Sequence, residues 1–218
     1  MDRIETYLVT QESLSPERTT PDVVRAAIDG GVDVVQVREK HAGAREQLRI
    51  ARELRSLTRD ADVPLIVNDR VDVAVAADAD GVHLGDEDLP VADARDQLGP
   101  DAIVGRSVST VEGAREAEAA GADYLGVGAV FATDSKDDID EDEYDIGLDP
   151  VRAIDDAVDI PLVGIGGVTA ENAHEVVNAG ADGVAVISAI TAADDPEAAT
   201  RDLGRAVREA NAGREVDA

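Results

Sequence analysis

The stretch AGADYLGV, residues 120–127, sets a glycine at the end of one helical pattern and begins a β-branched, apolar run directly afterwards. The same phrase returns as AGADGVAV at 179–186, and a related one, DGGVDVV, stands at 29–35. A glycine after the last helical turn is a common C-cap, so each phrase indicates a helix that passes straight into a strand. Repetition of one such junction indicates repetition of one structural unit.

Short β-branched runs recur at nearly even spacing along the whole chain. Several are apolar throughout, which is typical of parallel strands covered on both faces. Helical patterns lie between them, for example at 43–59 and 196–210. The runs predict strands at 6–10, 32–37, 64–69, 81–84, 102–107, 123–130, 161–168 and 183–190.

Strands alternating with helices in a chain of 218 residues leave two α/β architectures, a closed (β/α)₈ TIM barrel and a doubly wound open sheet. The open sheet favours a glycine-rich turn after the first strand, and YLVTQESLSPER (7–18) contains no glycine. We therefore predict the barrel, as a single domain over residues 1–218, because no shift in composition marks a boundary. We expect an acidic loop at 131–147 and a frayed tail at 212–218.

The composition excludes several classes of partner. A formal charge of −28 repels nucleic acid and anionic membrane surfaces, so we expect neither as a partner. Such an acidic, lysine-poor chain suits high salt, where surface repulsion is screened. There is no cysteine, no signal-peptide core in MDRIETYLVT (1–10) and no apolar run long enough to span a bilayer. We expect a cytoplasmic protein, and the sequence leaves open whether it forms a homo-oligomer.

Only two of the twenty basic residues are lysines, Lys40 in QVREK (36–40) and Lys136 in TDSKDD (133–138). Both follow the ends of predicted strands, and in a barrel those ends share one rim, where the chemistry takes place. Lysine is a compact, mobile point charge that suits a phosphate which changes position during a reaction. The two lysines therefore predict an anionic substrate at this rim.

Carboxylates follow two neighbouring strands on the same rim. Asp69 lies in VNDR (67–70) and Asp88 in GDED (85–88). Magnesium in proteins usually takes one or two carboxylates together with substrate phosphate oxygens and water. Asp69 and Asp88 thus predict a Mg²⁺ site that bridges to a diphosphate, whereas Asp86 and Glu87 alone indicate ordinary surface charge.

A second anion site is indicated by GIGGVT (164–169) and AVISAI (185–190), at the ends of the seventh and eighth predicted strands. Many barrels bind a phosphate there with backbone N–H groups, to which Ser188 can add a hydroxyl. His83 is either a satisfied core histidine or a ligand. Because the chain has no nucleophile elbow and no cysteine, we expect no covalent catalysis.

Taken in chain order, QVREK, VNDRVDVA, DGVHLGDED, GRS, GADYLGVGAVFATDSKDD, GIGGVTAEN and GVAVISAI resemble the thiamine phosphate synthase family. The resemblance covers nearly the whole chain. It implies a (β/α)₈ transferase that joins a hydroxymethylpyrimidine diphosphate to a thiazole phosphate, carboxylated or not, with release of pyrophosphate. It also implies a dissociative mechanism with Mg²⁺ as cofactor.

The resemblance assigns roles to residues at the matched positions. Asp69 and Asp88 would bind Mg²⁺, and Arg38, Lys40, Lys136 and Ser107 would act in catalysis. The pyrimidine diphosphate would be held by Gln36, Val37, Arg38, Glu39, Lys40, Asn68, Ser107 and Lys136. The thiazole phosphate would be held by Thr133, Asp134, Ser135, Gly167, Ile187 and Ser188.

The chain departs from the family pattern where Ser135 replaces a threonine, where Asp86 replaces a common glutamine, and in the acidic run after Lys136. Asp86 would add negative charge beside the metal site. Three other functions stay open. A thiazole tautomerase needs neither a diphosphate nor Mg²⁺, so Arg38, Lys40 and the aspartate pair favour the synthase. A non-catalytic phosphate-binding regulator would have no reason to keep them, and a sugar-phosphate epimerase needs an acid/base pair that the sequence does not reveal.

Overall fold

The computed structural model describes residues 4–133 and 145–217, and the side chains among them up to residue 214. Its strands form a closed, all-parallel barrel in the order β1 to β8, with β8 paired to β1. The strands are β1 Thr6–Val9, β2 Val34–Val37, β3 Leu65–Asn68, β4 Gly81–Leu84, β5 Ile103–Val108, β6 Tyr124–Val127, β7 Leu162–Ile165 and β8 Gly183–Val186. The β1–β8 pairing confirms the TIM barrel and excludes the open sheet.

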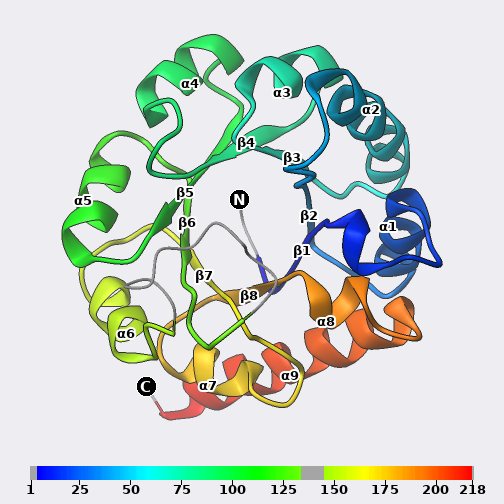
Figure 1. Cartoon of the computed structure of the whole chain (residues 1–218). Helices are drawn as coiled ribbons and strands as arrows, with labels where there is room; N and C mark the ends of the chain where they lie inside the picture. The colour runs from blue at the N-terminus through cyan, green and yellow to red at the C-terminus, as the bar shows by residue number, and fades with distance from the viewer. Residues whose placement is uncertain (1–3, 134–144, 218) are drawn as a thin grey trace.

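Helices surround the barrel as a ring (Figure 1). Local signals set their ends. In α1, for example, Thr19 and Asp22 form a capping box and a proline lies in the first turn. The helical elements are η1 Glu12–Leu14, α1 Thr20–Asp29, α2 Ala44–Asp60, α3 Val71–Ala77, α4 Val91–Leu98, α5 Val111–Ala119, α6 Asp149–Asp155, α7 Ala173–Asn178, α8 Ser188–Thr191 and α9 Pro196–Asp217.

The repeated junction of the sequence is a structural repeat at the start of every even-numbered strand. An aspartate directly precedes the strand, and its carboxylate accepts a hydrogen bond from a backbone N–H at the start of the strand before it. Two residues before each aspartate the backbone has a positive φ. The acceptors are Asp33 (from Thr6 N, 2.8 Å), Asp80 (Leu65 N, 2.7 Å), Asp123 (Val104 N, 2.7 Å) and Asp182 (Leu162 N, 2.9 Å).

Three of these four junctions were found in the sequence, and the fourth was missed. It is DADGVHL (78–84), in which Asp78 takes the left-handed conformation, with φ 55°, that glycine takes in the others. Aspartate tolerates that conformation better than most residues with a side chain. The unit therefore recurs in all four quarters of the barrel, although its glycine does not.

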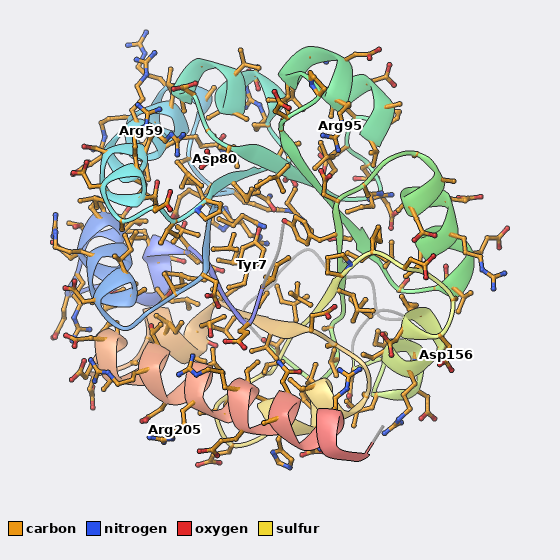
Figure 2. All side chains as sticks on the ribbon, turned by 180° about the vertical axis from the view of Figure 1, so that it is seen from behind. Tyr7, Arg59, Asp80, Arg95, Asp156 and Arg205 are labelled. Atoms are coloured by element: carbon orange, nitrogen blue, oxygen red, sulfur yellow. The ribbon has the colours of Figure 1, made fainter. Side chains whose placement is uncertain are left out.

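Apolar side chains form two separate layers. The larger one fills the space between strands and helices and includes Leu8, Val35 and Leu125. The smaller one fills the inside of the barrel and includes Tyr7, Ile66 and Tyr124. Figure 2 shows Tyr7 at the centre of the barrel, with Arg205 far outside on the helical ring. Within the described residues, the interior is therefore packed at its middle, and a pocket lies toward the rim.

Several predicted boundaries differ from the structure, for example the ends of the sixth and seventh strands, which lie at Val127 and Ile165 instead of at residues 130 and 168. The eighth strand was predicted to reach residue 190, but it ends at Val186 and α8 begins at Ser188. The last helix was predicted to end near residue 210, before a frayed tail, but α9 continues to Asp217. Arg214 explains the longer helix, because its guanidinium donates to the backbone oxygens of Val177 and Ala181. No helix in the described ranges has the length and apolarity needed to cross a membrane.

Candidate active site

A pocket opens inside the barrel at the carboxyl ends of the strands. It holds about 590 Å³ of empty space, including its open mouth. Six of the predicted site residues line this pocket, together with side chains that the sequence analysis did not single out. Its lining is Tyr7, Val9, Gln36, Arg38, Lys40, Asn68, Asp69, His83, Gly85, Ser107, Tyr124, Gly126, Val163, Ile165 and Ala185.

Three of these side chains come from the end of β2, because side chains along a strand alternate between its two faces. Successive strand residues point to opposite faces, so Gln36, Arg38 and Lys40 line the pocket. Val37 points the other way, into the core between strands and helices. Arg38 is buried, and its guanidinium donates to the Gln11 side chain at 3.3 Å. The predicted substrate residues of β2 therefore divide into a pocket-facing set and a set that faces away.

Glu39 belongs to the set that faces away. Its carboxylate accepts hydrogen bonds from Thr10 Oγ1 at 2.8 Å, from Thr20 Oγ1 at 3.2 Å and from the backbone N–H of Glu12 at 3.0 Å. The Thr10 hydroxyl in turn accepts from the backbone N–H of Arg38 at 3.1 Å. The Glu39 carboxylate thus ties the β1–α1 loop to the end of β2, and the pocket is lined by its neighbours.

The two predicted metal ligands and one of the two lysines meet at the mouth of the pocket. Asp69 Oδ2 lies 3.8 Å from Lys40 Nζ. Asp88 is close enough to Asp69 to act on its pKa through both charge and hydrogen bonding, and its Oδ2 accepts from the backbone N–H of Gly85 at 2.6 Å. The structure therefore brings the side chains of Lys40, Asp69 and Asp88 together, and the binding of a metal or an anion there stays a prediction.

Burial is the largest of the effects that raise the pKa of Asp69 to about 6, and the adjacent Asp88 adds to it, against the opposing charges of Lys40 and Arg38. Asp69 also has a positive φ of 61°, which is uncommon for a non-glycine residue and is tolerated better by aspartate than by most others. Two crowded carboxylates held this way suit a cation that neutralises both. In the described ranges no group of three or more acidic, histidine or cysteine side chains is placed to hold a metal.

Asp86, which replaces a common glutamine, does not add an unpaired charge beside this cluster. Its carboxylate is paired with the guanidinium of Arg106 on β5. Arg106 also donates to the backbone oxygen of Leu84 at 3.2 Å. The pair joins the β4–α4 loop, which carries Asp88, to the neighbouring strand.

Across the inside of the barrel, polar side chains from five strands form a continuous chain of hydrogen bonds. Gln36 Nε2 donates to Tyr7 Oη at 2.7 Å, and the two phenols of Tyr7 and Tyr124 are 2.8 Å apart. His83 Nδ1 lies 2.9 Å from Tyr124 Oη, and His83 Nε2 lies 2.9 Å from Ser107 Oγ. His83 is therefore a satisfied interior histidine that also lines the pocket.

Tyr7 and Tyr124 line the pocket and join this hydrogen-bond chain, and the sequence reasoning missed both. Their strands were predicted correctly, so the available signal was their place on the inward face. The aromatic content of the chain is only 2%. Two of its three tyrosines inside one barrel were a second signal, because a buried phenol needs a hydrogen-bond partner.

A second, smaller hollow of about 270 Å³ lies between the ends of β7 and β8. It is lined by Thr133, Ile165, Gly166, Gly167, Val168, Ala185, Val186, Ile187 and Ser188. These include all the described residues that were expected to hold a monophosphate. Asp134, Ser135 and Lys136, with the acidic run as far as residue 144, lie outside the described residues.

Comparison with known proteins gives consistent matches. The family described as thiamine monophosphate synthase matches residues 6–190. The thiamine-phosphate synthases of Haloarcula marismortui and Natronomonas pharaonis are 66% and 67% identical, over 94% and 92% of this chain and 97% and 94% of their own lengths. The solved thiamine phosphate pyrophosphorylase of Pyrococcus furiosus is 45% identical with a TM-score of 0.85, over 95% of this chain and 96% of that one.

Proposed function

The chain belongs to the thiamine monophosphate synthase family, a family of transferases, and we propose that it joins 4-amino-2-methyl-5-hydroxymethylpyrimidine diphosphate to a thiazole ethyl phosphate. The products would be thiamine phosphate and pyrophosphate. The observation that carries this choice of substrates is the meeting of Arg38, Lys40 and the Asp69–Asp88 pair at one pocket mouth. A tautomerase acting on the thiazole alone would have no use for such a diphosphate site.

The pyrimidine fits the inner part of the larger pocket. Apolar walls from Val9, Val163 and Ile165 suit the flat ring, and the polar chain from Gln36 to Ser107 offers hydrogen bonds to its nitrogens. The diphosphate then extends to the mouth of the pocket, where Arg38 and Lys40 supply positive charge. This local charge is needed because the net charge of −28 otherwise repels an anion.

Asp69 and Asp88 would hold Mg²⁺, with diphosphate oxygens and water as its remaining ligands. Both are hard oxygen donors of the kind that magnesium selects. Burial, together with the adjacent Asp88, raises the pKa of Asp69, and a bound cation would favour the ionised form of both carboxylates. When bound, the ion would supply positive charge to the diphosphate.

The reaction that we propose is dissociative. The C–O bond between the pyrimidine methylene and the diphosphate breaks, and its electron pair leaves with the diphosphate. Arg38 and Lys40 stabilise the charge that builds up on the leaving oxygens, and we assign Lys136 the same task. The thiazole nitrogen then forms the new C–N bond, and a carboxylated thiazole also loses carbon dioxide. No protein nucleophile takes part.

The thiazole phosphate would occupy the smaller hollow at β7 and β8. Backbone N–H groups around Gly166 and Gly167, with the hydroxyls of Thr133 and Ser188, suit a monophosphate. Ile165 and Ala185 line both hollows, so a ligand in one lies beside a ligand in the other. This adjacency is what a transfer between two substrates requires.

The decisive experiment is incubation of the purified protein with both substrates and Mg²⁺, with thiamine phosphate and pyrophosphate followed by chromatography. We expect the two products in equal amounts. Thiazole isomerisation without pyrophosphate release would instead support the tautomerase. Parallel assays with plain and carboxylated thiazole phosphate would identify the natural acceptor.

A further inference from the structure

The hydrogen bonds across the barrel can run in one of two directions, because each hydroxyl carries one proton. In one direction protons point from Gln36 toward Ser107, and in the other they point from Ser107 toward Gln36. Which direction holds decides the tautomer of His83. It also decides whether the Ser107 hydroxyl donates its hydrogen bond to His83 or is able to donate it to a ligand.

Burial raises the pKa of Tyr7 and the pKa of Tyr124 far above the ordinary value for a phenol, so both side chains keep their protons. The Gln36 amide nitrogen donates to Tyr7 Oη. The Tyr7 hydroxyl therefore accepts from Gln36 and still has its own proton to donate. Within the described residues, its other hydrogen-bond partner is Tyr124 Oη, at 2.8 Å.

The remaining steps follow in order. Tyr124 receives the proton of Tyr7 and donates its own to His83 Nδ1 at 2.9 Å. His83 then carries its proton on Nε2 and donates it to Ser107 Oγ at 2.9 Å. The reverse direction would leave Tyr7 accepting twice and its own buried proton without an acceptor, which folded proteins avoid.

Two glycines on β5 and β6 make room for the rings of this hydrogen-bond chain. A side-chain carbon at Gly105 on β5 would come within 2.1 Å of the Tyr124 ring, and one at Gly126 on β6 within 3.1 Å of the His83 ring. The rings of Tyr7 and Tyr124 lie 5.9 Å apart between centroids, and those of His83 and Tyr124 lie 5.5 Å apart. Glycine at these two positions leaves the space that the rings occupy.

We propose that the amide of Gln36 sets the direction of this hydrogen-bond chain, which holds His83 as the neutral Nε2–H tautomer and makes Ser107 a hydrogen-bond donor to the substrate. Tyr7, Tyr124 and His83 are positioning residues, because they act through Ser107. This role rests on the proposed function, since it requires a ligand with a hydrogen-bond acceptor in the pocket that Ser107 lines.

The tautomer can be measured directly on the ligand-free protein by ¹⁵N NMR with labelled histidine at a pH where the rings are neutral. The chain has three histidines, and His41→Gln and His174→Gln variants identify the signals of the two exposed ones. We expect a protonated Nε2 and an unprotonated Nδ1 for His83. A His83 protonated on Nδ1 in the wild-type protein overturns the proposal, whatever reaction the protein catalyses.

Gln36→Glu tests whether residue 36 sets the direction. An ionised carboxylate only accepts, so it should draw the Tyr7 proton, reverse the chain and move the His83 proton to Nδ1. Tyr124→Phe is the companion variant, since it cuts the chain and keeps the ring, and His83 should then lose its single tautomer. An unchanged His83 tautomer in either folded variant contradicts the proposal.

A double-mutant cycle tests the link to catalysis. We expect Tyr124→Phe to lower kcat/KM about tenfold, the order of one lost hydrogen bond in the transition state. In a Ser107→Ala background the same change should have almost no effect, because Tyr124 acts through the Ser107 hydroxyl. Equal losses in both backgrounds would show that Tyr124 acts independently of Ser107. Absence of thiamine phosphate from the wild-type reaction would instead refute the proposed function and leave the NMR result standing.

Discussion

The ammonium nitrogen of Lys40 lies 3.8 Å from Oδ2 of Asp69, although the two residues come from the ends of different strands. Lys40 follows β2 and Asp69 follows β3, which are neighbours in the barrel. The contact sets one of the two lysines beside the proposed magnesium ligands, where a diphosphate could touch both. The first prediction concerns this lysine.

Lys40→Ala should lower kcat roughly a hundredfold, the effect typical of removing one group that stabilises developing negative charge. Lys40→Arg should recover only part of the rate, because a planar guanidinium does not reproduce a mobile ammonium. Arg45→Ala, which removes an exposed cation from α2, is the matched control and should leave the rate unchanged. Steady-state assays of pyrophosphate release decide it, and similar rates for Lys40→Ala and Arg45→Ala would argue against the assigned role.

The metal-free protein should have a pH dependence of stability that depends on Asp69. Its pKa in the folded protein, about 6, is above the 3.8 of an ordinary aspartate, so the folded state binds the proton more tightly than the unfolded state does. The resulting contribution to stability is complete below pH 4 and is lost as the pH rises through about 6. Denaturant unfolding in EDTA should show this loss in the wild-type protein relative to Asp69→Asn. A constant difference between the two from pH 4 to 7 would refute it.

Asp88→Asn should lower the pKa of Asp69 only in part, because burial contributes more to the shift than Asp88 does. Carbon-detected NMR titration of the Asp69 carboxyl group measures this directly. The variant should also bind Mg²⁺ more weakly, since it loses one of two proposed carboxylate ligands. Asp86→Asn is the control on the same loop, because its carboxylate is paired with Arg106. An equal loss of Mg²⁺ affinity in both variants would show that Asp88 has no specific role in metal binding.

Glu39→Gln should raise the KM for the pyrimidine diphosphate while the protein stays folded. The carboxylate holds Thr10, Thr20 and the backbone of Glu12, and a neutral amide keeps only one acceptor oxygen. We expect kcat/KM to fall about tenfold, in line with lost hydrogen bonds to a charged group. Glu12→Gln removes an exposed charge from the same loop and should be neutral. Equal kinetics for the two variants would show that Glu39 does not position the β2 end.

Asp123→Ala should destabilise the fold without altering the site. Its carboxylate accepts from Val104 N at 2.7 Å and from Arg95 at 2.6 Å, at the end of the barrel opposite the pocket. Loss of these bonds should cost about 2 kcal/mol of unfolding free energy. Asp96→Ala, an exposed change within α4, should cost little. The prediction fails if urea melts of the two variants coincide.

Turnover should rise with potassium chloride. A charge of −28 opposes compaction by self-repulsion, and at about 1 M salt the screening length falls to about 3 Å. The acidic residues between 134 and 145 add to this repulsion next to Lys136. Rates at saturating substrate and melting temperatures should increase together. A maximal rate without added salt would count against this account.

Much of the fold was accessible from the sequence because it depends on local signals. Apolar, β-branched runs separated by helical patterns gave each strand, and the aspartate-containing junctions showed that one unit repeats. The predictions went wrong at element ends, as at Ser188 and beyond residue 210, where α8 and the Arg214 contacts depend on neighbouring elements. Site residues could be grouped by their place after strand ends, because parallel strands in a barrel bring those ends to one rim.

The sequence by itself determined the barrel and its repeating unit, and it placed Lys40, Asp69 and Asp88 after the ends of neighbouring strands, where the structure brings them together. Only the tertiary structure decided that the Glu39 carboxylate faces the β1–α1 loop, that Asp86 is paired with Arg106, and that Tyr7 and Tyr124 join His83 to Ser107. The physical reason is that strand order and periodicity are encoded along the chain. Hydrogen-bond partners, by contrast, are chosen across it, between side chains as many as 117 positions apart.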